Sequence, residues 1–165
     1  MDQGRNSKVL LGIAGVHYVV AELSRRNIIA LPTTRNTEEV DIIASNPNTG
    51  KAISIQAKTS QNKKSDRPNW LLTKGAERLK KSNLFYVFVY LPKGAYPDFY
   101  IVPSDTVSSY ITDTHKMWLK TPGTRGKPHK DSSIRQFPNE FKSIKLDDFK
   151  DKWELLGLWV NSNRI

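Results

Sequence analysis

Apolar positions recur along this chain with two different periods, and the change of period divides it into elements. From Lys8 to Arg26 they recur at helical spacing, which predicts an amphipathic helix with Ser7 as its N-cap. The stripe that we expect to face the core consists of Val9, Ile13, Val16, Val20 and Leu23. After this helix, most apolar runs up to residue 104 are short or alternate with polar residues, which is typical of strands.

Five segments predict strands: 28–33, 38–45, 51–59, 84–92 and 98–104. The turn-forming residues 46–50, Asn-Pro-Asn-Thr-Gly, separate the second and third, so we expect these two to pair as a hairpin. The run 84–92 is almost continuously apolar and predicts a buried central strand.

The remaining segments predict helices and loops. Helices are expected at 73–83, at 104–120 with Ser104 as N-cap, and at 146–159. Polar or breaker-rich composition predicts loops at 60–69 and 121–133. We see no internal repeat and no boundary, so residues 1–165 are expected to form a single α/β domain with helices on the faces of a mixed sheet.

Composition adds a strongly basic charge to this picture. The net charge is +10 and the isoelectric point about 9.8, which favours contact with a polyanion, nucleic acid first and an anionic membrane surface second. The chain has no cysteine, which excludes a disulfide scaffold, a thiolate metal site and a cysteine nucleophile. No segment reads as a run of ~18 apolar residues, so we expect a cytoplasmic protein without a membrane partner.

Polar side chains on the predicted hairpin are the candidates for chemistry. Gln56 and Lys58 are two residues apart on one strand and therefore share a face. Asp41 alternates with Val40 and Ile42 on the preceding strand, so it points away from the apolar face. If the strands pair, an acid, an amide and an amine converge, and the first helix could bring Glu22 over the same side.

In this order and spacing the chain resembles the PD-(D/E)xK nuclease superfamily. The resemblance covers roughly residues 8–103 and rests on three features. Glu22 matches a glutamate on the first helix, Asp41 matches an aspartate on the hairpin, and Gln56-Ala57-Lys58 matches the QxK form of the last motif. It implies an α/β, restriction-endonuclease-like fold with an αβββαβ core, a mixed central sheet and a C-terminal helical decoration over about residues 104–165. The chain departs from the family pattern where Val40 replaces the proline and Gln56 replaces the second acid.

The resemblance also implies a reaction and its participants. Asp41, Gln56, Glu22 and the backbone carbonyl of Ala57 would bind Mg²⁺, for which Mn²⁺ would substitute. Lys58 would assist the water that attacks a phosphodiester bond of DNA, with RNA left open as a substrate.

Basic residues that flank this strand, or lie in the later loop, would contact nucleic acid: Lys63, Lys64, Arg67, Lys74, Arg125, Lys127 and Lys130. The three histidines show no metal-ligand spacing and receive no role.

Other interpretations stay open at this point. Gln56 carries no charge, which is compatible with a catalytically inactive protein that only binds nucleic acid. Asp41 and Lys58 could form a surface ion pair, and Glu22 could pair with Arg25 or Arg26. A homodimer is possible, as is an accessory subunit that docks through the apolar C-terminal tail of Trp153, Leu155, Leu156, Leu158 and Trp159.

Overall fold

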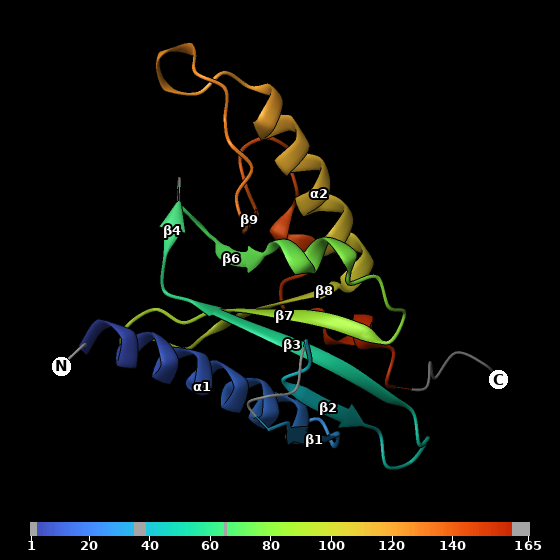
Figure 1. Cartoon of the computed structure of the whole chain (residues 1–165). Coiled ribbons are helices and arrows are strands. Elements are labelled where there is room, and N and C mark those ends of the chain that lie inside the picture. Colours follow the sequence, from blue (N-terminus) through green and yellow to red (C-terminus); the bar gives the residue numbers. More distant parts are fainter. Residues whose placement is uncertain (1–2, 35–38, 65, 160–165) are drawn as a thin grey trace.

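A five-stranded sheet forms the centre of the protein (Figure 1). The computed structural model describes residues 3–34, 39–64 and 66–159. In spatial order the strands are β1 (Ile29–Pro32), β2 (Ile42–Ser45), β3 (Ala52–Ser60), β7 (Leu84–Tyr90) and β8 (Asp98–Pro103). β3 and β7 pair in parallel, and the other neighbours pair antiparallel. The sheet is therefore mixed, as the sequence predicted.

The predicted hairpin of β2 and β3 is present. Ile42 lies opposite Ile55 and Ala44 opposite Ile53, so the apolar sides of both strands face the same core. At the turn, the backbone N–H of Asn48 donates to the side-chain oxygen of Asn46 over 2.8 Å. This asparagine turn sets the register that later places Asp41 beside Gln56.

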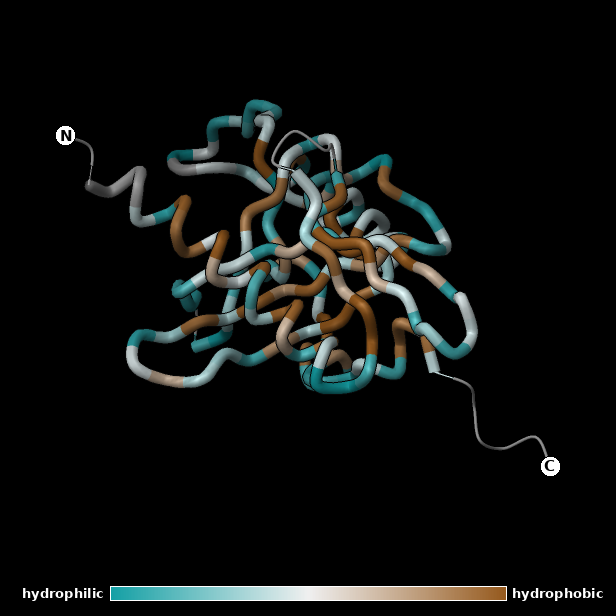
Figure 2. Tube along the Cα trace, turned by 90° about the horizontal axis from the view of Figure 1, so that it is seen from below, coloured by the Kyte–Doolittle hydropathy of each residue, from teal (hydrophilic) through white to brown (hydrophobic). Residues whose placement is uncertain are grey.

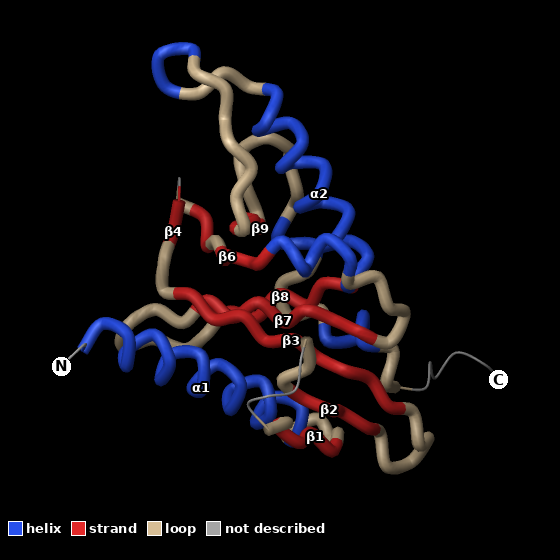
Figure 3. Tube along the Cα trace, viewed as in Figure 1, coloured by secondary structure: helices blue, strands red, loops and turns tan. Residues whose placement is uncertain are grey.

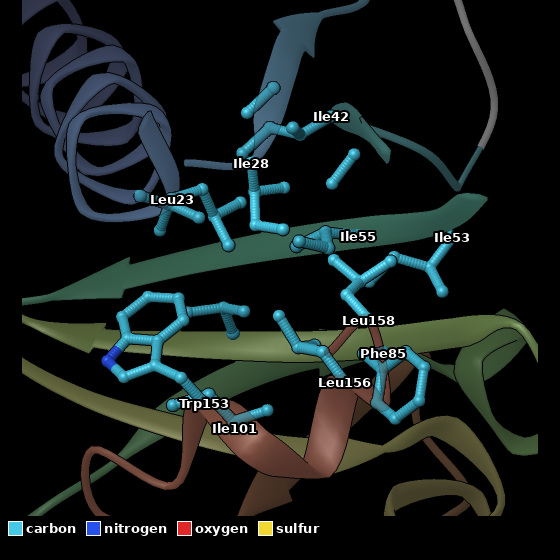
Figure 4. Packing of buried hydrophobic residues seen from close by; sticks show 14 of the residues in the cluster. Leu23, Ile28, Ile42, Ile53, Ile55, Phe85, Ile101, Trp153, Leu156 and Leu158 are labelled. Atoms are coloured by element: carbon cyan, nitrogen blue, oxygen red, sulfur yellow. The ribbon is translucent and has the colours of Figure 1, made fainter. Parts of the chain in front are cut away.

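Each face of the sheet carries its own hydrophobic core. Helix α1 (Gln3–Ser24) and the segment 153–158 cover one face, where Leu23, Ile42, Ile55 and Leu156 pack together (Figure 4). Helix α2 (Ser104–Lys120) covers the other face together with smaller elements. In Figure 2 the hydrophobic residues follow the central strands, and the outer loops are mostly hydrophilic.

Helix α1 begins earlier than the sequence predicted, and only the C-terminal part of the predicted stripe, Val16, Val20 and Leu23, packs on the core. It starts at Gln3, so Ser7 is not its N-cap. Val9 and Ile13 are 42% and 38% exposed, whereas Val19 and Leu23 are fully buried. The reason is that α1 contacts the sheet through β1 and β3 mainly along its C-terminal half (Figure 1).

Part of α1 is long and apolar enough to cross a membrane, although the sequence analysis predicted no such segment. By length and composition alone, residues 7–24 could cross a membrane, with a mean hydropathy of 1.2. Only 17% of this stretch is buried in the fold. The helix nonetheless packs on the sheet, because Val19 and Leu23 belong to the core beneath it.

The segments between β3 and β7 differ from the predicted loop and helix (Figure 3). The predicted loop 60–69 contains a small antiparallel pair. Of the predicted helix 73–83, only a 3-10 helix over residues 74–78 forms. The elements here are β4 (Lys63–Lys64), β5 (Arg67–Pro68), β6 (Trp70–Thr73) and η1 (Lys74–Arg78). β6 pairs with β9 (Ile134–Phe137), a strand that the sequence did not predict.

The C-terminal part is less helical than predicted. The predicted helix 104–120 is present as α2, but Ser104 exchanges hydrogen bonds with the backbone of Lys81 instead of capping the helix. The predicted helix 146–159 is replaced by two short 3-10 helices, since Asp151 and Gly157 have positive φ values that interrupt a helix. The 3-10 helices of this part are η2 (Thr124–Gly126), η3 (Leu146–Asp148) and η4 (Trp153–Leu156).

Candidate active site

Asp41 lies directly before β2 and is held by the backbone on both sides. Its N–H donates to the carbonyl of Ile55 over 2.8 Å, and its carbonyl accepts from the N–H of Thr33 over 2.9 Å. These bonds continue the ladder one residue beyond the strand. Because Ile42 points into the core, alternation turns the side chain of Asp41 to the opposite face of the sheet.

The carboxylate of Asp41 is hydrogen-bonded to β3, the strand that carries Gln56, Ala57 and Lys58. Its Oδ2 accepts a hydrogen bond of 2.8 Å from the backbone N–H of Ala57 and another from the side-chain amide of Gln56. Burial raises the pKa of Asp41, while the Ala57 bond, the Lys58 charge and the Gln56 bond oppose that rise. A half-buried carboxylate in this position is stabilised by donors or by a cation.

The backbone carbonyl of Ala57 faces the same edge of β3. In a strand, the N–H and C=O of one residue point to the same side, and the N–H of Ala57 points to Asp41. The pairing of β2 with β3 ends at Ile55, so β2 does not reach this carbonyl. The structure therefore directs the Ala57 carbonyl toward the Asp41 side chain.

These groups line one cavity of about 390 Å³. Asp41, Gln56, Ala57 and Lys58 form its sheet side, and α1 forms the other wall with residues that include His17. The sequence predictions for Asp41, Gln56, Ala57 and Lys58 thus name residues that the fold brings together. Gln56 and Lys58 pair in register with Tyr86 and Phe88, so they emerge on the α2 face of the sheet.

The donor set fits a hard divalent cation. Among the described residues, neither Oδ1 of Asp41 nor the amide oxygen of Gln56 has a hydrogen-bond partner. With the Ala57 carbonyl they offer three kinds of oxygen ligand, the type that Mg²⁺ prefers. The described residues contain no group of three or more His, Cys, Asp or Glu side chains placed to bind a metal. A cation here would therefore depend on amide and carbonyl oxygens as well as carboxylates.

Glu22 does not reach this cavity. It lies near the C-terminal end of α1, where its carboxylate pairs with Arg26 and, over 3.2 Å, with Arg25. The guanidinium of Arg26 also stacks 4.9 Å above the ring of Trp153. This is the arginine pairing that the sequence had left open. The sequence prediction placed Glu22 near the strands because helical spacing does not say which end of α1 crosses them.

The structure adds two polar residues that the sequence did not single out. His17 lines the Asp41 cavity from α1. Glu39 lines an adjoining cavity with Gln56 and Lys58. Alternation could have found Glu39, since it is two residues before Asp41. His17 follows Ile13 by one helical turn, and no feature of the sequence distinguishes it from a solvated residue.

The predicted nucleic-acid contacts fall into two groups. Lys63 and Lys64 line a larger groove, of about 710 Å³, together with Lys58 and with Lys8 of α1, which was not predicted. We call this the basic groove. It adjoins the Asp41 cavity at Lys58, which lines both. Arg67 lies on β5, next to the groove-lining strand β4.

The other group lies on the loop at the end of α2, far along the chain from β3 (Figure 1). Arg125, Lys127 and Lys130 are exposed there. The loop is attached to α2 because His129 stacks on Trp118, with ring centroids 4.1 Å apart. Lys74 is paired with Asp131 over 2.7 Å at the base of this loop. The fold thus divides the predicted basic residues between the basic groove and a separate loop.

Comparison with known proteins supports the fold. No protein-family model and no curated protein matches the chain. Its structure is similar to that of a bacterial homing endonuclease, I-Ssp6803I, with a TM-score of 0.54 and 15% identity over 89% of this chain and 88% of that chain. A Holliday junction resolvase, Hjc of Archaeoglobus fulgidus, matches with a TM-score of 0.47 and 12% identity over 91% of this chain and 98% of that chain. The chain has a restriction-endonuclease-like fold, as the resemblance predicted.

Proposed function

We propose that the protein is a metal-dependent endonuclease that hydrolyses phosphodiester bonds in DNA. The observation that carries this proposal is the convergence of Asp41, Gln56 and the Ala57 carbonyl on one edge of β3, with Lys58 in the same cavity. The similarity in fold to a homing endonuclease is consistent with it.

Each residue has a distinct part in the proposed reaction. Asp41, Gln56 and Ala57 would hold Mg²⁺ or Mn²⁺ through oxygen atoms. The bound cation would polarise a phosphoryl oxygen and lower the pKa of a water molecule. The ammonium of Lys58 would orient the attacking water and stabilise the negative charge that develops on the phosphate. Glu22 is not part of this proposal, since arginines hold its carboxylate.

The basic groove provides a binding surface for the substrate. Lys8, Lys63 and Lys64 would contact phosphates on the way to Lys58, which stands where the groove meets the Asp41 cavity. Such contacts do not depend on base sequence, and they weaken as salt rises. DNA is therefore the partner that we propose, and binding should be measurable without any metal.

Cleavage of supercoiled and linear DNA tests the proposal. The parent protein should cut with Mg²⁺ or Mn²⁺ and stop when EDTA is added. Asp41→Asn should abolish cutting, and Lys58→Ala should slow it by about 10²–10⁴-fold, because each removes a group at the reacting phosphate. Asp147→Asn and Lys51→Ala are matched controls at exposed positions outside the cavity and should cut normally. Normal cutting by a folded Asp41→Asn or Lys58→Ala protein would refute the assigned site.

The uncharged Gln56 favours a second candidate, a nucleic-acid-binding protein that does not cut. This protein would use the same basic groove, but its cavity would bind a cation too weakly for catalysis. Salt-sensitive DNA binding without cleavage in Mg²⁺ and in Mn²⁺ would select this candidate. Absence of DNA binding at moderate salt would reject both.

A further inference from the structure

A second cavity adjoins the first at Gln56 and Lys58. It has a volume of about 300 Å³, and both of these side chains line it as well as the Asp41 cavity. Glu39 and Tyr86 also line it. Gln56 therefore lines both cavities: its amide nitrogen donates to Asp41, and Glu39 lines the second cavity with it.

The backbone next to Glu39 is held firmly. The carbonyl of Val40 accepts a hydrogen bond of 2.5 Å from the hydroxyl of Thr33, and Asp41 is bonded through its backbone on both sides. Glu39 itself has a φ of +65°, a left-handed conformation that residues other than glycine seldom adopt. Glu39 lies two residues before Asp41, and the backbone that follows it is held by these hydrogen bonds.

Gln56 links the surroundings of the two acids. Its side-chain amide donates to Asp41, and the residue lines the same cavity as Glu39. Tyr86, the register partner of Gln56 on β7, lines this second cavity as well. Asp41 and Glu39 are two residues apart in the chain, and Gln56 lines the cavity of each.

We infer that Glu39 is the second carboxylate of the metal site, binding a divalent cation together with Asp41 and the amide oxygen of Gln56. This inference rests on the proposed function and deepens it. It supplies the negative charge that Gln56 lacks at its position and that Glu22 cannot contribute from the far end of α1. Two carboxylates and a neutral amide give the site the charge that a divalent cation requires.

An ordinary surface ion pair is the competing explanation for Glu39. Its Oε2 lies 3.4 Å from the ammonium of Lys81, and both side chains are partly exposed, at 38% and 57%. Such a pair contributes little to stability and would weaken in salt. The same lysine would compete with a cation for the carboxylate, so removing it separates the two explanations.

Direct measurement of Mn²⁺ binding, by calorimetry and by the paramagnetic signal of free Mn²⁺, tests the inference without relying on activity. The full chain is compared with Glu39→Gln, Glu22→Gln and Lys81→Ala. Glu39→Gln and Glu22→Gln are matched, because each removes one negative charge and keeps the side-chain size. Circular dichroism and thermal unfolding confirm that each variant is folded.

We expect Glu39→Gln to weaken Mn²⁺ affinity by at least about 10- to 100-fold, because losing a charged ligand costs no less than losing a group that only supports a ligand. Glu22→Gln should bind as the parent does, and Lys81→Ala should bind equally well or more tightly. Unchanged affinity in Glu39→Gln, or an equal loss in Glu22→Gln or Lys81→Ala, would overturn the inference.

The failure of the inference and the failure of the proposed function give different results. If the parent cuts DNA while Glu39→Gln keeps full Mn²⁺ affinity, the inference fails and the function stands. If the parent binds Mn²⁺ through Glu39 but does not cut, the function fails and the inference stands. A parent that neither binds Mn²⁺ nor cuts refutes both.

Discussion

Replacement of Gly15 by alanine tests how α1 is seated over the active-site strand. Gly15 is buried against Thr59 of β3. A Cβ at this position would lie 1.7 Å from the Oγ1 of Thr59 and 2.9 Å from its Cβ. No real Cβ contact is that short, so the Thr59 side chain, α1 or β3 has to shift. Since His17 lies two residues further along α1, a shift of α1 would also reshape the Asp41 cavity.

The expected magnitude combines two opposing effects. Exchange of glycine for alanine inside a helix stabilises by about 1 kcal/mol. Overpacking of a filled contact costs about 1–3 kcal/mol. Gly12 provides a matched control one turn earlier, because a Cβ there would meet nothing within 4 Å. Gly12→Ala should therefore gain about 1 kcal/mol, and Gly15→Ala should be less stable than Gly12→Ala by about 1–3 kcal/mol.

Thermal and urea unfolding of both variants give the measurement. For a domain of this size, 1 kcal/mol shifts the midpoint of unfolding by about 2–4 °C, so Gly15→Ala should unfold roughly 2–12 °C below Gly12→Ala. Thr59→Ala removes the closest atom and should reduce the cost of Gly15→Ala in the double variant by about 0.5–3 kcal/mol. Equal stability of Gly12→Ala and Gly15→Ala, or no coupling to Thr59→Ala, would refute the described seating of α1.

Three further results are expected. Gln56→Glu should tighten Mn²⁺ binding, because a carboxylate attracts the cation more strongly than an amide does. Without metal the variant should be less stable, because two carboxylates then face each other and the amide donor is lost. A calorimetric titration in which the Mn²⁺ affinity is unchanged would exclude Gln56 as a ligand. Asp131→Asn should lower the unfolding temperature at neutral pH, because Lys74, His115 and Arg135 lower the pKa of Asp131 in the folded protein. The stabilisation by the Asp131 carboxylate is present above its ordinary pKa of about 3.9 and is lost as the pH falls below that value. A difference from the parent that persists at strongly acidic pH would contradict this. Lys63→Ala should reduce the slope of log affinity for DNA against log salt by about one unit, and an unchanged slope would remove Lys63 from the binding surface.

The sequence was most successful where a local pattern has one structural solution. Alternation and turn residues predicted the hairpin of β2 and β3, and the structure confirms that these strands pair. The same alternation predicted that Gln56 and Lys58 share a face, and that Asp41 turns away from Ile42. A residue at a strand position has only two directions available, so the side on which it emerges follows from its neighbours.

The predictions were wrong where an element depends on what it packs against. The pattern of 146–159 is compatible with a helix, but Trp153 and Leu156 pack on the sheet core from a short 3-10 helix, and Leu158 packs there from the segment after it. β6 and β9 form a separate two-stranded sheet, and each exists because the other is opposite it, although 60 residues lie between them in the chain. Propensity is weak compared with such tertiary contacts.

The sequence by itself determined the polar residues of the β2–β3 hairpin, the basic charge and the order of the first helix, the five sheet strands and α2, because each follows from period, turn chemistry or composition. Only the tertiary structure decided which further acidic residues lie near Gln56 and Lys58. It placed Glu22 with arginines at one end of α1 and brought Glu39 to the cavity beside Gln56. The contact of Gly15 with Thr59 sets where α1 crosses β3, and such a crossing depends on the close approach of two segments distant in sequence.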